Sequence, residues 1–238
     1  MQKNYKYYDL ILGAYVCVLL CANLIGPAKV ATIHVPVIGA VTFMAGVLFF
    51  PISYVFGDVL TEVYGYARAR QVIWTGFFCN LVAVIAIWIG GLLPSAPFWS
   101  AGNFSTPQTA QGAYQAILGF TPRLLLASFI AYLIGEFLNS FVLAKLKLKT
   151  AGRFLWIRTI GSTLIGQGAD SAVFITIAFA GIIPGSGLLQ AILSQWFLKT
   201  AYETIATPLT YIVVNALKKV ESEDYFDRDT DFNPFIAQ

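Results

Sequence analysis

Residues 71–93 read QVIWTGFFCNLVAVIAIWIGGLL and contain no charged side chain. A helix needs about 20 consecutive apolar residues to cross a bilayer, so this stretch is long enough to span a membrane. The whole chain has the same character: 58% of its 238 residues are hydrophobic and 11% are charged, whereas soluble domains carry about 25% charged residues. We therefore predict an all-α polytopic membrane protein.

Similar apolar runs, separated by breaks rich in proline and glycine, predict a six-helix transmembrane domain over residues 1–220. The expected spans are 9–26, 38–60, 71–93, 122–145, 157–183 and 188–217. Pro51 predicts a tilt or a break in the second span, whose apolar stretch is longer than a perpendicular crossing needs. Residues 94–121 are expected to form the longest linker. Residues 221–238 are expected to form an acidic, poorly ordered cytoplasmic tail.

The distribution of lysine and arginine predicts the orientation of these spans. If every span crosses once, four basic groups fall on the same side of the membrane. They are Lys3 and Lys6, Arg68 and Arg70, the group from Lys145 to Arg158, and Lys218 and Lys219. The positive-inside rule then places both termini in the cytoplasm.

Ionisable residues inside the predicted spans are the strongest functional signal in the sequence. With a rise of 1.5 Å per residue, Asp58, Glu136 and Asp170 lie roughly 13–18 Å from the nearest basic residue on the cytoplasmic side. A charge at that depth costs on the order of 3 kcal/mol, so it is expected to face the bundle interior, to pair, or to line a wet cavity. Lys199 and Glu203 are four positions apart and could pair with each other.

Amides share this depth, and together with the carboxylates they predict a pocket for a small polar ligand. Aromatic side chains at Tyr54, Phe56, Phe174 and Trp196 could stack on a flat ligand. The expected substrate-binding residues are Asp58, Glu62, Asn80, Glu136, Asn139, Gln167, Asp170, Gln195, Lys199 and Glu203. Two structural alternatives remain open: the amides could hydrogen-bond helices together, and Glu62 could pair with Arg68 or Arg70.

No catalytic constellation, metal site or cofactor motif is expected from the sequence. A single histidine and three dispersed cysteines offer no metal spacing, and there is no phosphate-binding loop or nucleophile elbow. Basic residues cluster where topology explains them, so nucleic acid is not an expected partner. The expected partners are a small-molecule substrate and membrane lipid, and a homo-oligomer is left open.

Four segments resemble the queuosine precursor transporter family, also described as the VUT family. They are the stretch from Phe43 that ends in GDVLTEVYGYARAR at Arg70, GEFLNSFVLAKLK at 135–147, RTIGSTLIGQGADSAVFITIAF at 158–179, and KTAYETIATPLTYIVVNALK at 199–218. The resemblance implies an importer of the 7-deazaguanine bases preQ0 and preQ1 in the bacterial cytoplasmic membrane. It also implies a six-helix fold like that of the substrate-binding components of energy-coupling-factor transporters, acting without an ATPase.

The residues alone leave several function classes to compare. A secondary importer of a small planar polar solute fits polar groups gathered at one depth, whereas a channel would need them along a whole pore. A membrane enzyme lacks a catalytic constellation. A solute-binding subunit that needs partner subunits for energy stays open as the main alternative.

Overall fold

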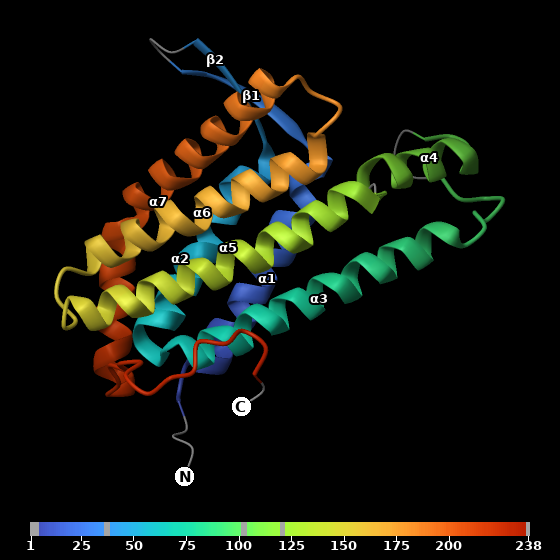
Figure 1. Cartoon of the computed structure of the whole chain (residues 1–238). Coiled ribbons are helices and arrows are strands. Elements are labelled where there is room, and N and C mark those ends of the chain that lie inside the picture. Colours follow the sequence, from blue (N-terminus) through green and yellow to red (C-terminus); the bar gives the residue numbers. More distant parts are fainter. Residues whose placement is uncertain (1–4, 36–38, 101–103, 120–121, 237–238) are drawn as a thin grey trace.

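The computed structural model describes residues 5–35, 39–100, 104–119 and 122–236. Its long helices lie side by side in a slanted bundle, with α2 behind α5 and α6 in the view of Figure 1. The helices are α1 (Tyr8–Ala28), α2 (Phe50–Tyr64), α3 (Tyr66–Leu92), α4 (Pro107–Leu118), α5 (Pro122–Lys149), α6 (Leu155–Phe179) and α7 (Gly185–Glu221). Helix α2 contacts α1, α3, α5 and α7, so it occupies the centre of the bundle.

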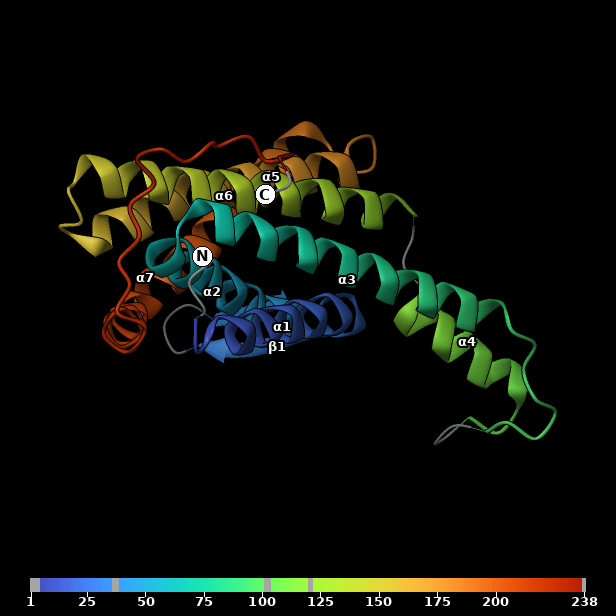
Figure 2. The ribbon, with the colours of Figure 1, turned by 90° about the horizontal axis from the view of Figure 1, so that it is seen from below.

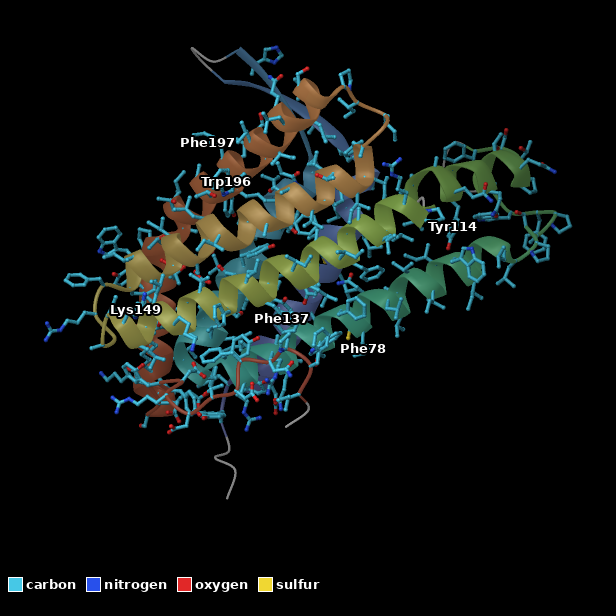
Figure 3. The ribbon with its side chains drawn as sticks, viewed as in Figure 1. Phe78, Tyr114, Phe137, Lys149, Trp196 and Phe197 are labelled. Carbon is cyan, nitrogen blue, oxygen red and sulfur yellow. The ribbon has the colours of Figure 1, made fainter. Side chains whose placement is uncertain are left out.

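Large apolar side chains are exposed on the outer surface of the bundle, and its interior holds both apolar and polar side chains. Phe78 on α3 and Phe197 on α7 project outward with 56% and 71% of their surface exposed (Figure 3). Four segments are long and apolar enough to cross a membrane: Tyr8–Gly26, Tyr66–Leu92, Leu155–Phe179, and Pro107–Lys149, which runs across residues 120–121 outside the described part of the chain. This arrangement fits a multi-pass membrane protein, because lipid can cover the apolar surface.

The prediction of a helix over residues 38–60 is wrong for the first half of that range. Strands β1 (Val30–Val35) and β2 (Gly39–Met44) pair antiparallel, with Val30 opposite Met44, and a short 3-10 helix η1 (Ala45–Leu48) follows. β-branched residues favour this extended pairing over a helix. Helix α2 begins only at Phe50, just before the proline at which a break was predicted. Its 15 residues cover about 22 Å, less than the ~30 Å hydrocarbon core.

Helices α2 and α3 are joined by a single residue, Gly65, where the sequence predicts a longer linker that contains two arginines. Gly65 has φ +85°, a conformation that residues with a side chain rarely adopt. A Cβ at this position would also lie 2.3 Å from the ring of Tyr225. Both constraints require glycine here, and the arginines fall inside α3 instead.

The predicted linker at 94–121 contains a helix that was not expected. Helix α4 starts at a capping box, in which the Thr109 backbone N–H donates to Thr106 Oγ1 at 3.3 Å and the Thr106 N–H donates to Thr109 Oγ1 at 3.2 Å. Pro107 occupies the first turn, where its missing N–H costs nothing. The C-terminal part of α3, together with α4, extends away from the other helices (Figure 2).

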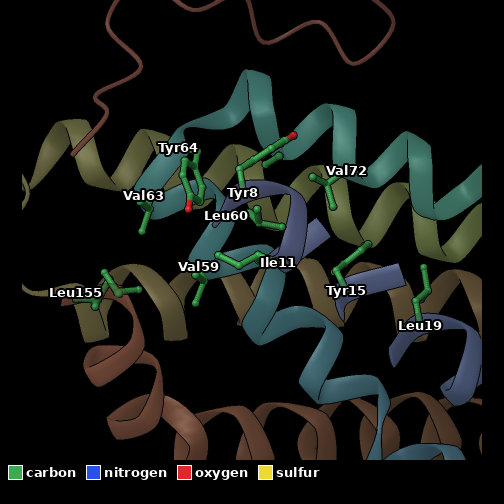
Figure 4. Close-up of a cluster of buried hydrophobic side chains, with 12 residues drawn as sticks. Tyr8, Ile11, Tyr15, Leu19, Val59, Leu60, Val63, Tyr64, Val72 and Leu155 are labelled. Atoms are coloured by element: carbon green, nitrogen blue, oxygen red, sulfur yellow. The ribbon is translucent and has the colours of Figure 1, made fainter. Parts of the chain in front are cut away.

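The apolar core lies where α1 packs on α2 and α3. On α1, Tyr8, Ile11, Tyr15 and Leu19 recur every three or four residues and therefore share one face. That face packs against a set from the other helices (Figure 4), which comprises Val59, Leu60, Val63, Tyr64, Ala69, Val72, Leu155 and Val214. This core holds α2 in a fixed position beside α5, α6 and α7.

The acidic tail is ordered and packs on the bundle, contrary to the expectation from its charge. Asp227, which is 1% exposed, accepts hydrogen bonds from the Tyr66 N–H at 3.0 and 3.1 Å and so caps α3. The Arg70 guanidinium donates to the Asp231 and Asn233 carbonyls at 3.1 and 2.6 Å. The tail therefore pairs with backbone and side-chain groups that the helices leave unsatisfied.

The two ends of the described chain meet at one end of the bundle (Figure 1). The backbone N–H groups of Lys6 and Tyr7 donate to the Glu221 carboxylate at 2.9 and 2.7 Å, which caps the start of α1. This geometry requires an even number of membrane crossings between Lys6 and Glu221.

Candidate functional site

Four helices converge on a group of buried polar side chains, here called the central polar cluster. Helix α2 contributes one member, and α5, α6 and α7 contribute two each, spaced three or four residues apart so that each pair lies on one helix face. Every member is at most 8% exposed. The members are Asp58, Glu136, Asn139, Gln167, Asp170, Lys199 and Glu203.

Contacts between helices hold the cluster together. The Asn139 amide donates to Asp58 Oδ1 at 2.7 Å, linking α5 to α2. The Lys199 ammonium pairs with the Asp170 carboxylate, linking α7 to α6. The predicted pair of Lys199 with Glu203 is therefore wrong. Glu203 instead faces Asp58.

Glycines allow α5 and α6 to approach closely beside the cluster. A Cβ at Gly166 would lie 2.9 Å from the Gly135 carbonyl oxygen and 2.7 Å from the Asn139 Cβ. A Cβ at Gly135 would lie 2.8 Å from the Asp170 Cβ. Small residues at a helix crossing bring backbones together in membranes, and here they also fix the positions of Asn139 and Asp170.

Several cluster atoms have no hydrogen-bond partner among the residues that the structure describes. They are both carboxylate oxygens of Glu136 and of Glu203, the Asn139 carbonyl oxygen, and both amide atoms of Gln167. Tyr15 lies beside Glu136, and Thr163 and Gln167 lie beside Glu203, so small shifts could pair some of these atoms with each other. The others have hydrogen-bonding capacity for water or a ligand. Seven of the ten predicted residues therefore belong to one buried polar cluster. That they bind a substrate and line a shared cavity stays a prediction.

One aromatic candidate reaches the cluster and another has a structural role. The Tyr54 ring is 3% exposed, and its hydroxyl would lie 2.9 Å from a Cβ at Gly135. The Trp196 indole N–H donates to the Leu164 carbonyl at 2.9 Å, so this ring packs α7 onto α6. Phe50 was not predicted, and the Lys199 ammonium lies 5.7 Å from its ring centre.

Of the remaining aromatic candidates, Phe56 packs against the apolar core and Phe174 contacts Phe179 edge to face. Thr163, which faces Glu203, was missed. Its spacing of four from Gln167 was the signal that could have found it.

Glu62 lies in a separate ion-pair network at the end of the bundle where the termini meet. Its carboxylate accepts two hydrogen bonds from Arg158 at 2.7 and 3.1 Å and one from Lys218 at 2.6 Å. Lys147 lies 3.5 Å from the same carboxylate, and both lysines also bind Asp224 at 2.6 and 2.8 Å. We call these five residues the Glu62 network. The expected partners of Glu62, Arg68 and Arg70, are not among them.

Within the described residues, no hydrogen bond or ion pair joins the amides Asn80 and Gln195 to the cluster. The Asn80 carbonyl oxygen accepts from the Asn23 amide at 3.2 Å, which ties α3 to α1. Gln195 lies one turn before Lys199, and its carbonyl oxygen is buried without a partner. Asn80 therefore matches the structural alternative of an amide that joins two helices.

A surface cleft elsewhere does not compete with the cluster as the functional site. It lies beside α4 and is lined by Ser95, Pro97, Pro107, Gln108, Gln111, Gly112 and Gln115. None of these side chains is charged, and Gln111 already donates to the Gly91 carbonyl at 3.0 Å. The cluster has the charge and the unpaired groups that a polar ligand requires, and the cleft does not.

Comparison with known proteins assigns the chain to a transport family. A family described as "Putative vitamin uptake transporter" matches residues 44–213. The chain belongs to this family. The matched range contains every residue of the central polar cluster, and it leaves out α1, β1 and the tail.

Curated relatives of the vitamin uptake transporter family align over much of this chain. A "Probable queuosine precursor transporter" of Bacillus subtilis is 31% identical over 182 residues, 76% of this chain and 72% of the relative. A protein with the same name from Haemophilus influenzae is 29% identical over 56% of the chain and 51% of the relative. The "Queuosine precursor transporter" of Escherichia coli is 29% identical over 56% of the chain and 54% of the relative. No solved structure gives a significant match.

Proposed function

We propose that this protein imports queuosine precursors, the 7-deazaguanine bases preQ0 and preQ1, across the bacterial cytoplasmic membrane, and that it acts as a secondary transporter. Family membership and the names of three relatives support the substrate class. The observation that carries the proposal is the set of unpaired buried polar atoms on α5, α6 and α7 inside an otherwise apolar bundle.

The chemistry of the cluster suits such a base. A guanine-like edge presents adjacent N–H groups, and one carboxylate can accept two of them in parallel. Asp170 is proposed for this contact, with Lys199 holding its carboxylate in place. Glu136 is proposed for the cationic aminomethyl group of preQ1, and Asn139 and Gln167 for the remaining polar edge. Tyr54 supplies an aromatic wall.

We further propose six crossings with both termini in the cytoplasm. The bundle end that carries the termini also carries Arg70, Lys147, Arg158 and Lys218, in agreement with the positive-inside rule. Helix α7 is about 55 Å long and would cross with a tilt. Reporter fusions after residues 110 and 150 should report opposite sides of the membrane, and reporters on one side would overturn this topology.

Uptake by the purified protein tests the proposed function. The protein alone, reconstituted in liposomes, should take up radiolabelled preQ0 or preQ1, and excess unlabelled base should compete. Guanine and adenine at the same concentration test selectivity. Binding without any uptake would favour the alternative, a solute-binding subunit that needs partner proteins. If the protein showed no binding and no uptake of either base, the proposal would be contradicted.

A further inference from the structure

The central polar cluster holds more negative than positive charge. In the described part of the chain its carboxylates are Asp58, Glu136, Asp170 and Glu203, and its cation is Lys199. Lys199 pairs with Asp170, which leaves the other three carboxylates without a paired cation in the cluster. A buried carboxylate without a counter-charge is costly, so a proton or another positive group must neutralise part of this charge.

Asp58 on α2 and Glu203 on α7 are both buried, and these two helices pack against each other, so that the two carboxylates lie close enough to interact. Asn139 donates to Asp58 at 2.7 Å, and both oxygens of Glu203 lack a donor. Two ionised carboxylates in contact repel, whereas one proton between them makes a hydrogen bond and removes one charge. We propose that Asp58 and Glu203 form a proton-binding pair whose proton enters the cell together with the substrate.

The groups around the pair leave it without a competing cation. Tyr54 and Glu62 from α2 and Glu136 from α5 face the pair directly. Beyond them, Tyr15 from α1, Asp170 from α6 and Lys199 from α7 lie against Glu136. Glu62 is held by the cations of its own network, and Lys199 is held by Asp170. No described group of three or more His, Cys, Asp and Glu side chains is placed to hold a metal ion.

Gln167 connects the pair to the substrate site. Its side chain is fully buried, neither amide atom has a partner, and it faces Glu203. A base that hydrogen-bonds to Gln167 therefore lies next to the protonated pair. One proton would be taken from the outside, carried with the base and released to the cytoplasm when the pair is exposed there. This inference rests on the proposed function, because it needs a transported base.

Transport by the full chain in liposomes separates the two ideas. The probe is preQ0, which is neutral, so its accumulation reports proton movement alone. With one proton carried per base, an outside pH one unit below the inside should drive about tenfold accumulation, and an uncoupler should abolish it. Exchange of labelled for unlabelled preQ0 across the membrane needs no net proton movement and serves as the second readout.

We expect Asp58→Asn and Glu203→Gln to keep measurable exchange and to lose the pH-driven accumulation. Asp229→Asn, an exposed tail substitution, should keep both. Accumulation by Glu203→Gln at the wild-type level would overturn the proton pair, as would accumulation that follows a sodium gradient instead of pH. Loss of exchange in both variants would assign the pair to substrate binding. Failure of the wild type in exchange would instead count against the proposed function.

Discussion

Replacing Glu62 with glutamine tests whether this residue is structural, as its contacts indicate. The substitution removes a carboxylate that is 0% exposed and holds two hydrogen bonds to Arg158 and one to Lys218. Glutamine has nearly the same volume as glutamate but only one acceptor oxygen in place of two. The buried Arg158, 1% exposed, would lose its neutralising charge, whereas Lys147 would keep its ion pair with Asp224.

Removing one partner of a buried ion pair costs about 3–5 kcal/mol, because the other charge remains buried. For a chain of this size, 1 kcal/mol corresponds to roughly 2–4 °C in Tm. We therefore expect Glu62→Gln to lower Tm by about 6–20 °C, measured by thermal unfolding of the purified protein in detergent. Binding of preQ0 well below the Tm should be within about twofold of wild type.

The matched control is Asp229→Asn, which neutralises an exposed tail carboxylate and should leave Tm unchanged. A Tm within 2 °C of wild type for Glu62→Gln would show that the network contributes little. Unchanged stability together with a large loss of binding would return Glu62 to the substrate site and refute the structural reading.

Asp170→Asn should weaken preQ0 binding roughly ten- to hundredfold in calorimetry, because an amide donor would face a ligand donor. The substitution also leaves Lys199 without its ion-pair partner, so the Tm of the variant must be measured together with its affinity. Unchanged affinity for preQ0 would remove Asp170 from the site. Gly65→Ala should cost about 1–3 kcal/mol through strain, besides the clash with Tyr225, and an unchanged Tm would contradict this. Burial opposes ionisation of Asp224, but hydrogen bonds from two lysines outweigh it and lower its pKa. Its contribution to stability is present above the unfolded value of about 3.9 and is lost as pH falls through the lower folded value, so the Tm difference between wild type and Asp224→Asn should close only in acid.

Much of the helical architecture could be predicted from the sequence because lipid imposes a simple length rule. Continuous apolar runs such as 71–93 correspond to helices in the structure. The rule failed at residues 39–44, where a run that is equally apolar pairs as a strand. Hydropathy alone does not separate the two, because an apolar strand and an apolar helix score alike.

The candidate site was predictable to the level of residues but not of partners. Costly charges at Asp58, Asp170 and Glu203 pointed to side chains that are buried in the structure, since a charge inside an apolar span is expected to avoid lipid. Pairing across helices depends on rotation and tilt, which one sequence does not specify. Lys199 was thus matched with its neighbour on the same helix, Glu203, instead of Asp170. Glu62 was one turn from Asp58, yet its partners came from three other parts of the chain.

The docking of residues 222–236 has a consequence for the order of assembly. These residues leave the ribosome after all the helices, and they supply the cap on α3 and the carbonyl groups that bind Arg70. Until they arrive, the start of α3 and the arginine lack these final contacts. A nascent chain that stalls after α7 therefore presents a recognisable unfinished surface to membrane quality-control proteases. A reporter or tag fused at the C-terminus needs a flexible spacer so that this last step can occur.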